Sequence, residues 1–70
     1  MNESNACILE ILQKQEQPVT APCLRRLLAA AGVEISISAL YRALEELYRD
    51  GAVTWTTTRR IRRFAAANKD

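Results

Sequence analysis

The hydrophobic period of this sequence changes once, at Gly51, and that change limits the folds that the chain can adopt. Before Gly51, apolar residues recur every three or four positions, as they do on one face of a helix. After it, residues 52–57 and 61–64 are rich in β-branched and aromatic side chains, which is typical of strands. A chain of 70 residues has room for one small domain. We therefore predict a single domain over residues 1–70 of class α+β, mostly α, in which helices precede a two-stranded hairpin.

The first helix is predicted over residues 5–17. Pro18 disfavours helical geometry at the residue before it, so the helix should stop there. Ser4 or Asn5 can cap its start through a short side-chain oxygen. The apolar residues at helical spacing are Ile8, Ile11 and Leu12, with Cys7 and Leu9 on the flanks.

The second helix is predicted over residues 21–31. Thr20 is a good N-cap, and Gly32 can end the helix in the left-handed conformation that glycine adopts cheaply. Arg25 and Arg26 point away from its apolar stripe, which predicts a solvated face. The stripe consists of Leu24, Leu27, Leu28 and Ala31.

The third helix is predicted over residues 37–50, after a short connector at residues 33–35. Ser36 caps it, and Gly51 ends it as Gly32 ends the helix before. Its inner stripe is Leu40, Ala43, Leu44 and Leu47. Its outer face carries Ser38, Ala39, Tyr41, Arg42, Glu45, Glu46 and Arg49.

A hairpin is predicted over residues 52–65, with a frayed tail over residues 66–70. Its turn contains no Gly, Asn or Asp, which tight two-residue turns favour. The loop is therefore expected to be longer and looser, or to become ordered only against a ligand. Phe64 should pack inward, so a regular strand would point Arg62 and Arg60 inward as well. Burying unpaired arginines is costly, so we expect the strand to bulge or to end before Arg60.

The residue types argue against an enzyme. The sequence has no His, which removes the usual general base and the commonest metal ligand. Cys7 and Cys23 lack the close spacing of a zinc or redox site and are expected to be small buried hydrophobes. With no glycine-rich phosphate loop, we predict no catalytic residue, no metal and no cofactor.

No apolar run approaches the roughly 18 residues of a membrane span, and no basic-then-apolar leader is present, so we expect a cytoplasmic protein.

The charge is uneven along the chain: residues 1–35 carry three basic and four acidic side chains, and residues 36–70 carry seven basic and four acidic ones. Four of those seven, Arg59, Arg60, Arg62 and Arg63, lie within five positions. Such a cluster predicts a polyanion bound at one face.

Three helices followed by a hairpin are the element order of a winged helix-turn-helix. In that arrangement the third helix enters the major groove of DNA and the hairpin, or wing, lies on the backbone or in the minor groove. Arg42 has a donor fork suited to a guanine edge, and Ser38 and Tyr41 can reach phosphates or a thymine methyl. Arg42 could instead pair with Glu45 or Glu46 along its own helix.

The run Ile35-Ser36-Ile37-Ser38-Ala39-Leu40-Tyr41-Arg42-Ala43-Leu44, followed by Leu47 and Gly51-Ala52-Val53, resembles the recognition-helix region of the ferric uptake regulator family. The resemblance covers roughly residues 6–65. It implies a winged helix in which Tyr41 and Arg42 contact DNA. Members of that family continue into a metal-binding dimerisation domain that has no counterpart in this sequence, so metal sensing is not implied. Ala39 stands where the family often has Thr.

We therefore expect a small sequence-specific regulator of transcription, of bacterial or phage type, that binds double-stranded DNA as a dimer or cooperatively and acts as a repressor or an activator. Glu45 and Glu46 could either read bases or repel phosphate. In the wing, Arg62 should contribute least. The residues expected to contact DNA are Ser36, Ser38, Ala39, Tyr41, Arg42, Glu45, Arg59, Arg60 and Arg63.

The alternative is a winged-helix module that docks on a repressor or a polymerase subunit. In that case Leu9, Tyr48 and Trp55 would form an apolar patch for the partner protein.

Overall fold

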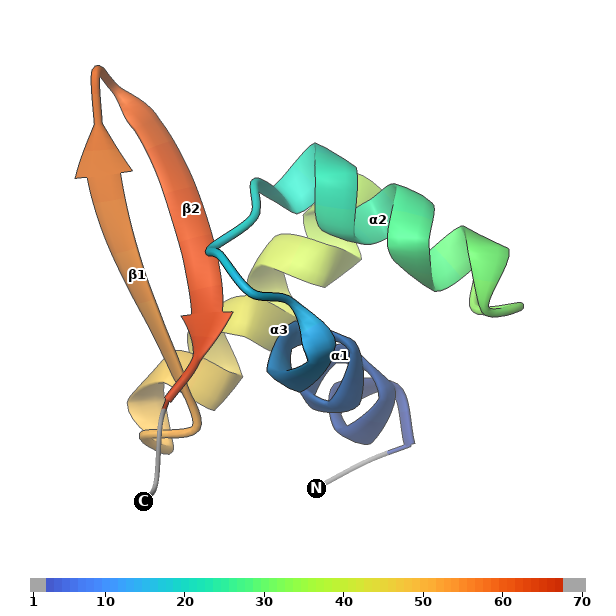
Figure 1. Cartoon of the computed structure of the whole chain (residues 1–70). Coiled ribbons are helices and arrows are strands. Elements are labelled where there is room, and N and C mark those ends of the chain that lie inside the picture. Colours follow the sequence, from blue (N-terminus) through green and yellow to red (C-terminus); the bar gives the residue numbers. More distant parts are fainter. Residues whose placement is uncertain (1–2, 68–70) are drawn as a thin grey trace.

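The computed structural model describes residues 3–67, in which three helices are followed by a two-stranded antiparallel sheet (Figure 1). This confirms the predicted α+β class, mostly α, with the element order of a winged helix-turn-helix. The elements are α1 (Glu3–Lys14), α2 (Ala21–Ala30), α3 (Ile37–Arg49), β1 (Val53–Thr58) and β2 (Ile61–Ala66).

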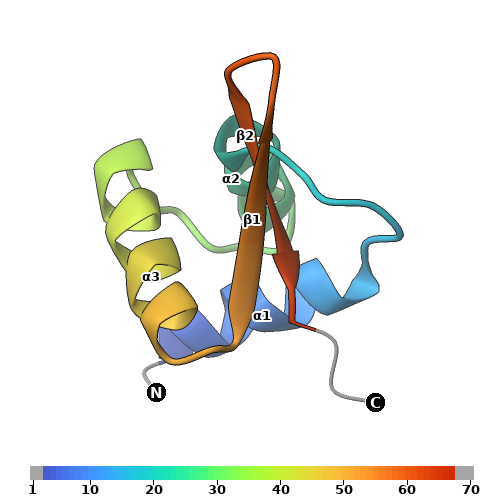
Figure 2. The same ribbon diagram turned by 90° about the vertical axis from the view of Figure 1, so that its left-hand side faces the viewer.

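The hairpin of β1 and β2, called the wing below, projects beyond the helices (Figure 1). Its turn lies at the opposite end of the molecule from the places where the described chain begins and ends. In the view turned by 90°, α3 lies along one side of the wing and α1 crosses beneath both (Figure 2). One side of α3 therefore faces the wing, and another side is left open.

The core collects apolar side chains from all five elements. Val53 and Phe64 anchor the base of the wing in it, with 1% and 3% of their surface exposed. The inner stripe predicted for α3 is confirmed in full, whereas Leu27 is only half-buried and Ala31 is exposed. The core residues are Ile8, Leu12, Ala21, Leu24, Leu28, Leu40, Ala43, Leu44, Leu47, Val53 and Phe64.

The helix α1 differs from its prediction at both ends. It begins at Glu3, so Ser4 and Asn5 lie inside the helix rather than capping it. It ends at Lys14, three residues before the predicted end at residue 17. The side-chain amide of Gln15 donates to the Ile11 carbonyl at 3.1 Å, where the next helical amide would otherwise bind. The chain is thus released from the helix well before Pro18.

The segment after α1 pairs with β2 through a single antiparallel β-bridge, which was not predicted from the sequence. The amide of Val19 donates to the Phe64 carbonyl at 2.9 Å, and the amide of Phe64 donates to the Val19 carbonyl at 2.7 Å. Extended backbone at Val19 is needed for this pairing, which is a second reason for α1 to end early.

The predicted caps of the other helices are present. Thr20 accepts a hydrogen bond from the amide of Cys23 at 3.3 Å, and Ser36 accepts one from the amide of Ala39 at 3.1 Å. Gly32 and Gly51 adopt the left-handed conformation, with φ of +88° and +80°. Because each helix ends before a separate C-cap residue, α2 and α3 are each one residue shorter at this end than predicted.

The wing turn contradicts the expected loose loop. The strands pair without interruption from Val53↔Ala66 to Thr58↔Ile61, so neither strand bulges. The other expected outcome is confirmed, because β2 excludes Arg60 and starts at Ile61. Arg59 and Arg60 alone form the turn, with φ of +54° and +68°. Positive φ at both residues matches the twist of the strands, which is why the turn is tight even without glycine. Side chains with a Cβ pay roughly 1–2 kcal/mol per residue for this conformation.

The predicted tail over residues 66–70 lies only partly within the described chain. Ala66 is the last residue of β2, and the amide of Ala67 donates to the Ala52 carbonyl at 2.8 Å, so both are ordered against the sheet. Residues 68–70 lie outside the described residues. Cys7 and Cys23 are free thiols and only half-buried, which corrects the expectation of full burial.

Candidate nucleic-acid interface

The open face of α3 carries charged and polar side chains. The helical repeat places Ser38, Arg42, Glu45 and Arg49 along one line, and all four are exposed. Glu45 and Arg49 approach to 4.0 Å, with 69% of each side chain exposed, so this ion pair is weak. It is the one ion pair within residues 3–67, so Arg42 does not pair with Glu45 or Glu46. The guanidinium group of Arg42 is therefore available to bind DNA or another partner.

Glu46 lies on a different side of α3 from Glu45. Its carboxylate accepts a 3.2 Å hydrogen bond from the side-chain amide of Asn5, which is buried in α1. This contact directs Glu46 toward α1 and away from the open face. Of the two carboxylates predicted for the outer face, Glu45 is the one found there.

Ser36 and Ala39 lie at the N-terminus of α3 and are joined by a capping hydrogen bond. The hydroxyl oxygen of Ser36 accepts from the amide of Ala39, so Ser36 is a cap, and its hydroxyl hydrogen remains able to donate. Ala39 is half-buried. Both residues therefore lie at the helix end next to the α2–α3 connection.

The side of α3 that faces the wing is aromatic. Tyr41 meets Phe64 edge-on at 6.3 Å between ring centres, and Tyr48 packs against Trp55 at 5.9 Å. The guanidinium carbon of Arg62 lies 4.4 Å from the centre of the Trp55 ring. Trp55 thus packs between helix and wing. The predicted apolar patch already grouped Tyr48 with Trp55, whereas the stacking of Arg62 on Trp55 was not predicted.

The four wing arginines point in different directions. Arg59 and Arg60 form the exposed tip. Arg62 shares a face with Trp55 and Phe64, because its register partner is Thr57. Arg63 lies on the other face and is half-buried. The premise that an inward Arg62 would be buried is wrong: Arg62 remains exposed because it lies over Trp55 near the tip of the wing.

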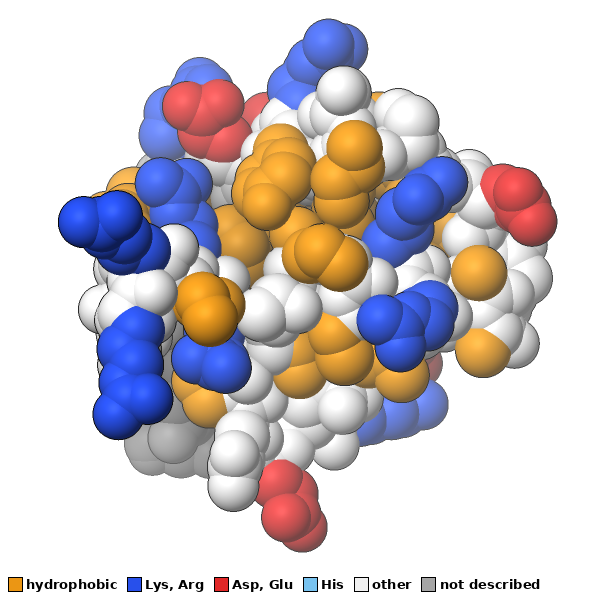
Figure 3. Space-filling view, turned by 90° about the horizontal axis from the view of Figure 1, so that it is seen from above, with side chains coloured by type: hydrophobic (Ala, Val, Ile, Leu, Met, Phe, Trp, Pro, Cys, Tyr) orange, Lys and Arg blue, Asp and Glu red, His pale blue; other side chains and the backbone are white. Residues whose placement is uncertain are grey.

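A view from the wing-tip end shows how these charges are arranged. Lys and Arg side chains surround a group of hydrophobic side chains on this face, and Asp and Glu side chains lie near its rim (Figure 3). The face is therefore predominantly basic. A basic face is the electrostatic footprint of a protein that binds a polyanion.

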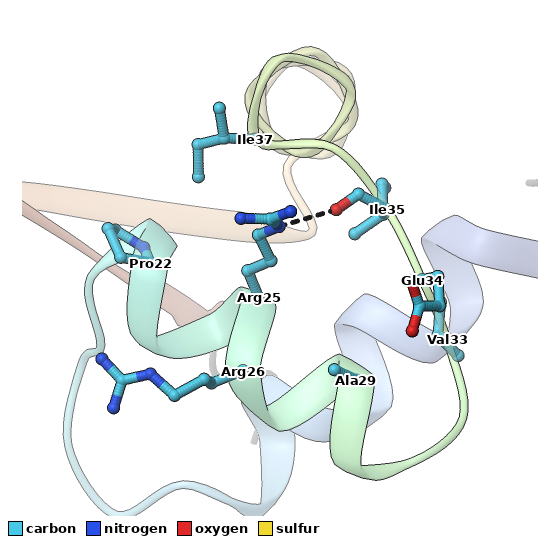
Figure 4. A pocket seen from close by; sticks show the side chains of 8 residues that line it. All are labelled: Pro22, Arg25, Arg26, Ala29, Val33, Glu34, Ile35 and Ile37. Carbon is cyan, nitrogen blue, oxygen red and sulfur yellow. Dashed lines mark hydrogen bonds between the residues drawn. The ribbon is translucent and has the colours of Figure 1, made fainter.

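The connection between α2 and α3 is fastened by an arginine. The Nε of Arg25 donates to the Ile35 carbonyl at 2.9 Å, whereas Arg26 extends away from it (Figure 4). Arg25 is therefore more than part of a solvated face: it ties α2 to the residue that precedes the α3 cap. An open hollow of about 580 Å³ lies here, lined by Pro22, Arg25, Arg26, Ala29, Val33, Glu34, Ile35 and Ile37.

Residues 3–67 contain neither a cluster of metal-ligating side chains nor a membrane-spanning helix. Nowhere in that range do three His, Cys, Asp or Glu side chains lie close enough together to hold a metal ion. None of its helices is long and apolar enough to cross a bilayer.

Comparison with known proteins shows a similarity in structure. The sequence matches no protein-family model and no curated protein. The structure, however, is similar to the crystal structure of the ferric uptake regulator (Fur) of Vibrio cholerae, with a TM-score of 0.86 and 28% sequence identity. The match covers 99% of this chain and 54% of the Fur chain, so this chain spans about half the length of that protein. The chain is a winged helix-turn-helix that resembles the DNA-binding domain of the ferric uptake regulator.

Proposed function

We propose that the chain is a sequence-specific DNA-binding regulator of transcription. The observation that carries this proposal is the similarity, over nearly the whole chain, to a ferric uptake regulator with DNA-binding domains. The basic face around α3 and the wing supports it, because phosphate neutralisation supplies much of the affinity of proteins for DNA. We place the protein in the cytoplasm, where its DNA target would be.

In this proposal the open face of α3 enters the major groove. Arg42 makes the main base contact, since its unpaired guanidinium can donate twice to a guanine edge. Glu45 accepts from a cytosine amino group, and Ala39 touches a thymine methyl. Tyr41, on the side of α3 that faces the wing, donates to a phosphate. Ser36 and Ser38, near the start of the helix, donate to phosphates.

The wing contacts the backbone or the adjacent minor groove. Arg59 and Arg60 reach furthest, since they form the tip, and Arg63 contributes from the other face of the hairpin. A single domain of this size gives a small footprint, so we propose that two copies bind as a dimer or cooperatively on repeated half-sites.

Selection of bound duplexes from a random pool, followed by fluorescence anisotropy, tests the proposal. We expect one enriched motif that binds roughly 1,000-fold or more tightly than random DNA at moderate salt. Enrichment of no motif, with binding to random DNA intact, would contradict sequence specificity. Binding to no duplex even at low salt would contradict DNA binding altogether. It would favour the alternative of a protein-docking module, with the exposed Tyr48 and Trp55 as its surface.

A further inference from the structure

A second hollow, called the wing hollow here, lies between α3 and the wing near its tip. It is open, measures about 380 Å³, and is lined by Tyr41, Thr57, Arg60 and Arg62. These residues come from α3, β1, the turn and β2, respectively. We propose that the wing hollow binds one phosphate group of the DNA backbone. This inference rests on the proposed function and identifies a contact point for it.

The chemistry of the lining suits an anion. Two guanidinium groups and two hydroxyl groups can all donate hydrogen bonds, and charge-assisted bonds from arginine to phosphate are among the strongest in proteins. No carboxylate lines the hollow. Glu45 lines the neighbouring hollow of about 270 Å³, and its charge is partly offset by Arg49. Two arginines beside one hollow repel each other unless an anion lies between them.

The lining is held in place before any ligand binds. Arg62 stacks on Trp55, and Trp55 is supported in turn by Tyr48. Thr57 and Arg62 are direct partners across the two strands, so their side chains share one face. The tight turn fixes the backbone of Arg60, whose side chain is exposed beside them. Groups that are fixed in this way lose little conformational freedom on binding, which favours affinity.

The position agrees with the expected path of DNA. A sugar–phosphate strand separates the major groove from the adjacent minor groove. If α3 lies in the major groove and the wing tip reaches the next minor groove, that strand passes between helix and wing. The wing hollow lies in this gap. This assignment replaces the sequence-based expectation that Arg62 contributes least of the wing arginines. That expectation assumed that an arginine on the Phe64 face would be withdrawn from solvent, whereas Arg62 lies on that face and is exposed.

The test compares variants on the selected duplex and on a random duplex over a range of salt concentrations. Arg62→Ala should weaken binding about 10-fold on both, because a phosphate contact carries no sequence information. It should also reduce the logarithmic salt slope by about 0.9, the value for one lost phosphate contact. Thr57→Val should weaken binding about threefold without changing the slope, because it removes a donor and no charge. Lys14→Ala, which removes one charge at the end of α1, is the matched control and should change neither quantity.

A second measurement locates the phosphate. Duplexes in which single phosphates are replaced by neutral methylphosphonates should include one position that weakens wild-type binding and leaves Arg62→Ala unaffected. If wild type binds DNA and Arg62→Ala keeps its affinity and slope, the wing hollow is not a phosphate site and the proposed function stands. If wild type binds no duplex, both proposals fail. Should Arg62→Ala lower the melting temperature, Thr57→Val and the methylphosphonate scan of wild type decide the matter.

Discussion

The side-chain amide of Asn5 in α1 donates a 3.2 Å hydrogen bond to the carboxylate of Glu46 in α3. Asn5 has only 6% of its surface exposed, and Glu46 belongs to the helix that carries the proposed base contacts. The contact therefore fastens the recognition helix to the scaffold. It also removes one carboxylate from the face that would meet DNA.

Replacing Asn5 by Ala should lower the free energy of unfolding by about 1–2 kcal/mol, because Glu46 loses a partner at a partly buried site. Urea unfolding measures this loss. A double-mutant cycle with Glu46→Ala should give a coupling energy of about 0.5–1.5 kcal/mol. Glu46→Ala should leave the selected DNA motif unchanged, whereas Glu45→Gln should alter it. A change of motif in Glu46→Ala would place that carboxylate at the bases after all.

Ser36 should contribute to stability as well as to binding. Ser36→Ala should lower the free energy of unfolding by about 1 kcal/mol, because the amide of Ala39 loses its cap. Ser36→Asp restores the cap and adds a negative charge, so it should keep stability and weaken DNA binding. Ser38→Ala, on an exposed neighbour, is the control for stability. Unchanged DNA affinity in Ser36→Asp would show that the residue is a cap and is remote from phosphate.

Arg42 should carry discrimination between DNA sequences. Arg42→Ala is expected to cost about 1–3 kcal/mol on the selected duplex and much less on random DNA. Competition anisotropy with both duplexes measures the difference. Since Arg42 forms no ion pair within residues 3–67, stability should change little. Equal losses on the two duplexes would make Arg42 a phosphate contact.

The residues of the wing turn, Arg59 and Arg60, should lower the stability of the fold and strengthen DNA binding. Arg59→Asn with Arg60→Gly places at the turn the residues that tolerate positive φ, so the double variant should be more stable by about 1 kcal/mol or more. It should also bind DNA more weakly, with a salt slope lower by about 1.8 if both arginines meet phosphates. Thermal unfolding and salt titration measure the two effects.

Arg59→Ala with Arg60→Ala is the matched control for this turn. It removes the same charges without easing the backbone, so it should lose the same slope and gain no stability. A gain in stability equal to that of the Asn-Gly variant would show that charge repulsion, and not positive φ, is what destabilises the turn.

Much of the fold could be read from local signals. Thr20, Ser36, Gly32 and Gly51 mark helix ends through interactions with the backbone beside them, so no distant residue is needed to recognise them. The apolar stripe of α3 and the strand character after Gly51 follow from periodicity in the same way. The outer face of α3 was predicted in the same way, apart from Glu46, which turns toward α1, and Tyr41, which faces the wing.

Most features that were missed depend on contacts between residues far apart in the chain, whereas the tight wing turn is a local exception. The early end of α1 accompanies the pairing of Val19 with Phe64, 45 positions later, and Glu46 is directed by Asn5, 41 positions earlier. The wing register shows the same limit. From the sequence, the cost of burying an inward-facing arginine predicted a bulge or a strand end before Arg60. Nothing in the sequence showed that Trp55 offers Arg62 an exposed surface near the turn.

The sequence by itself thus determined which segments are helices and strands, where capped helices begin and end, and that four arginines gather in one short stretch, because propensity, capping and charge act over a few residues. Tertiary structure alone decided where those arginines point and that Arg62 stacks on Trp55. Strand pairing across the turn assigns each side chain to a face, and a shift of one residue in that pairing would reverse every assignment.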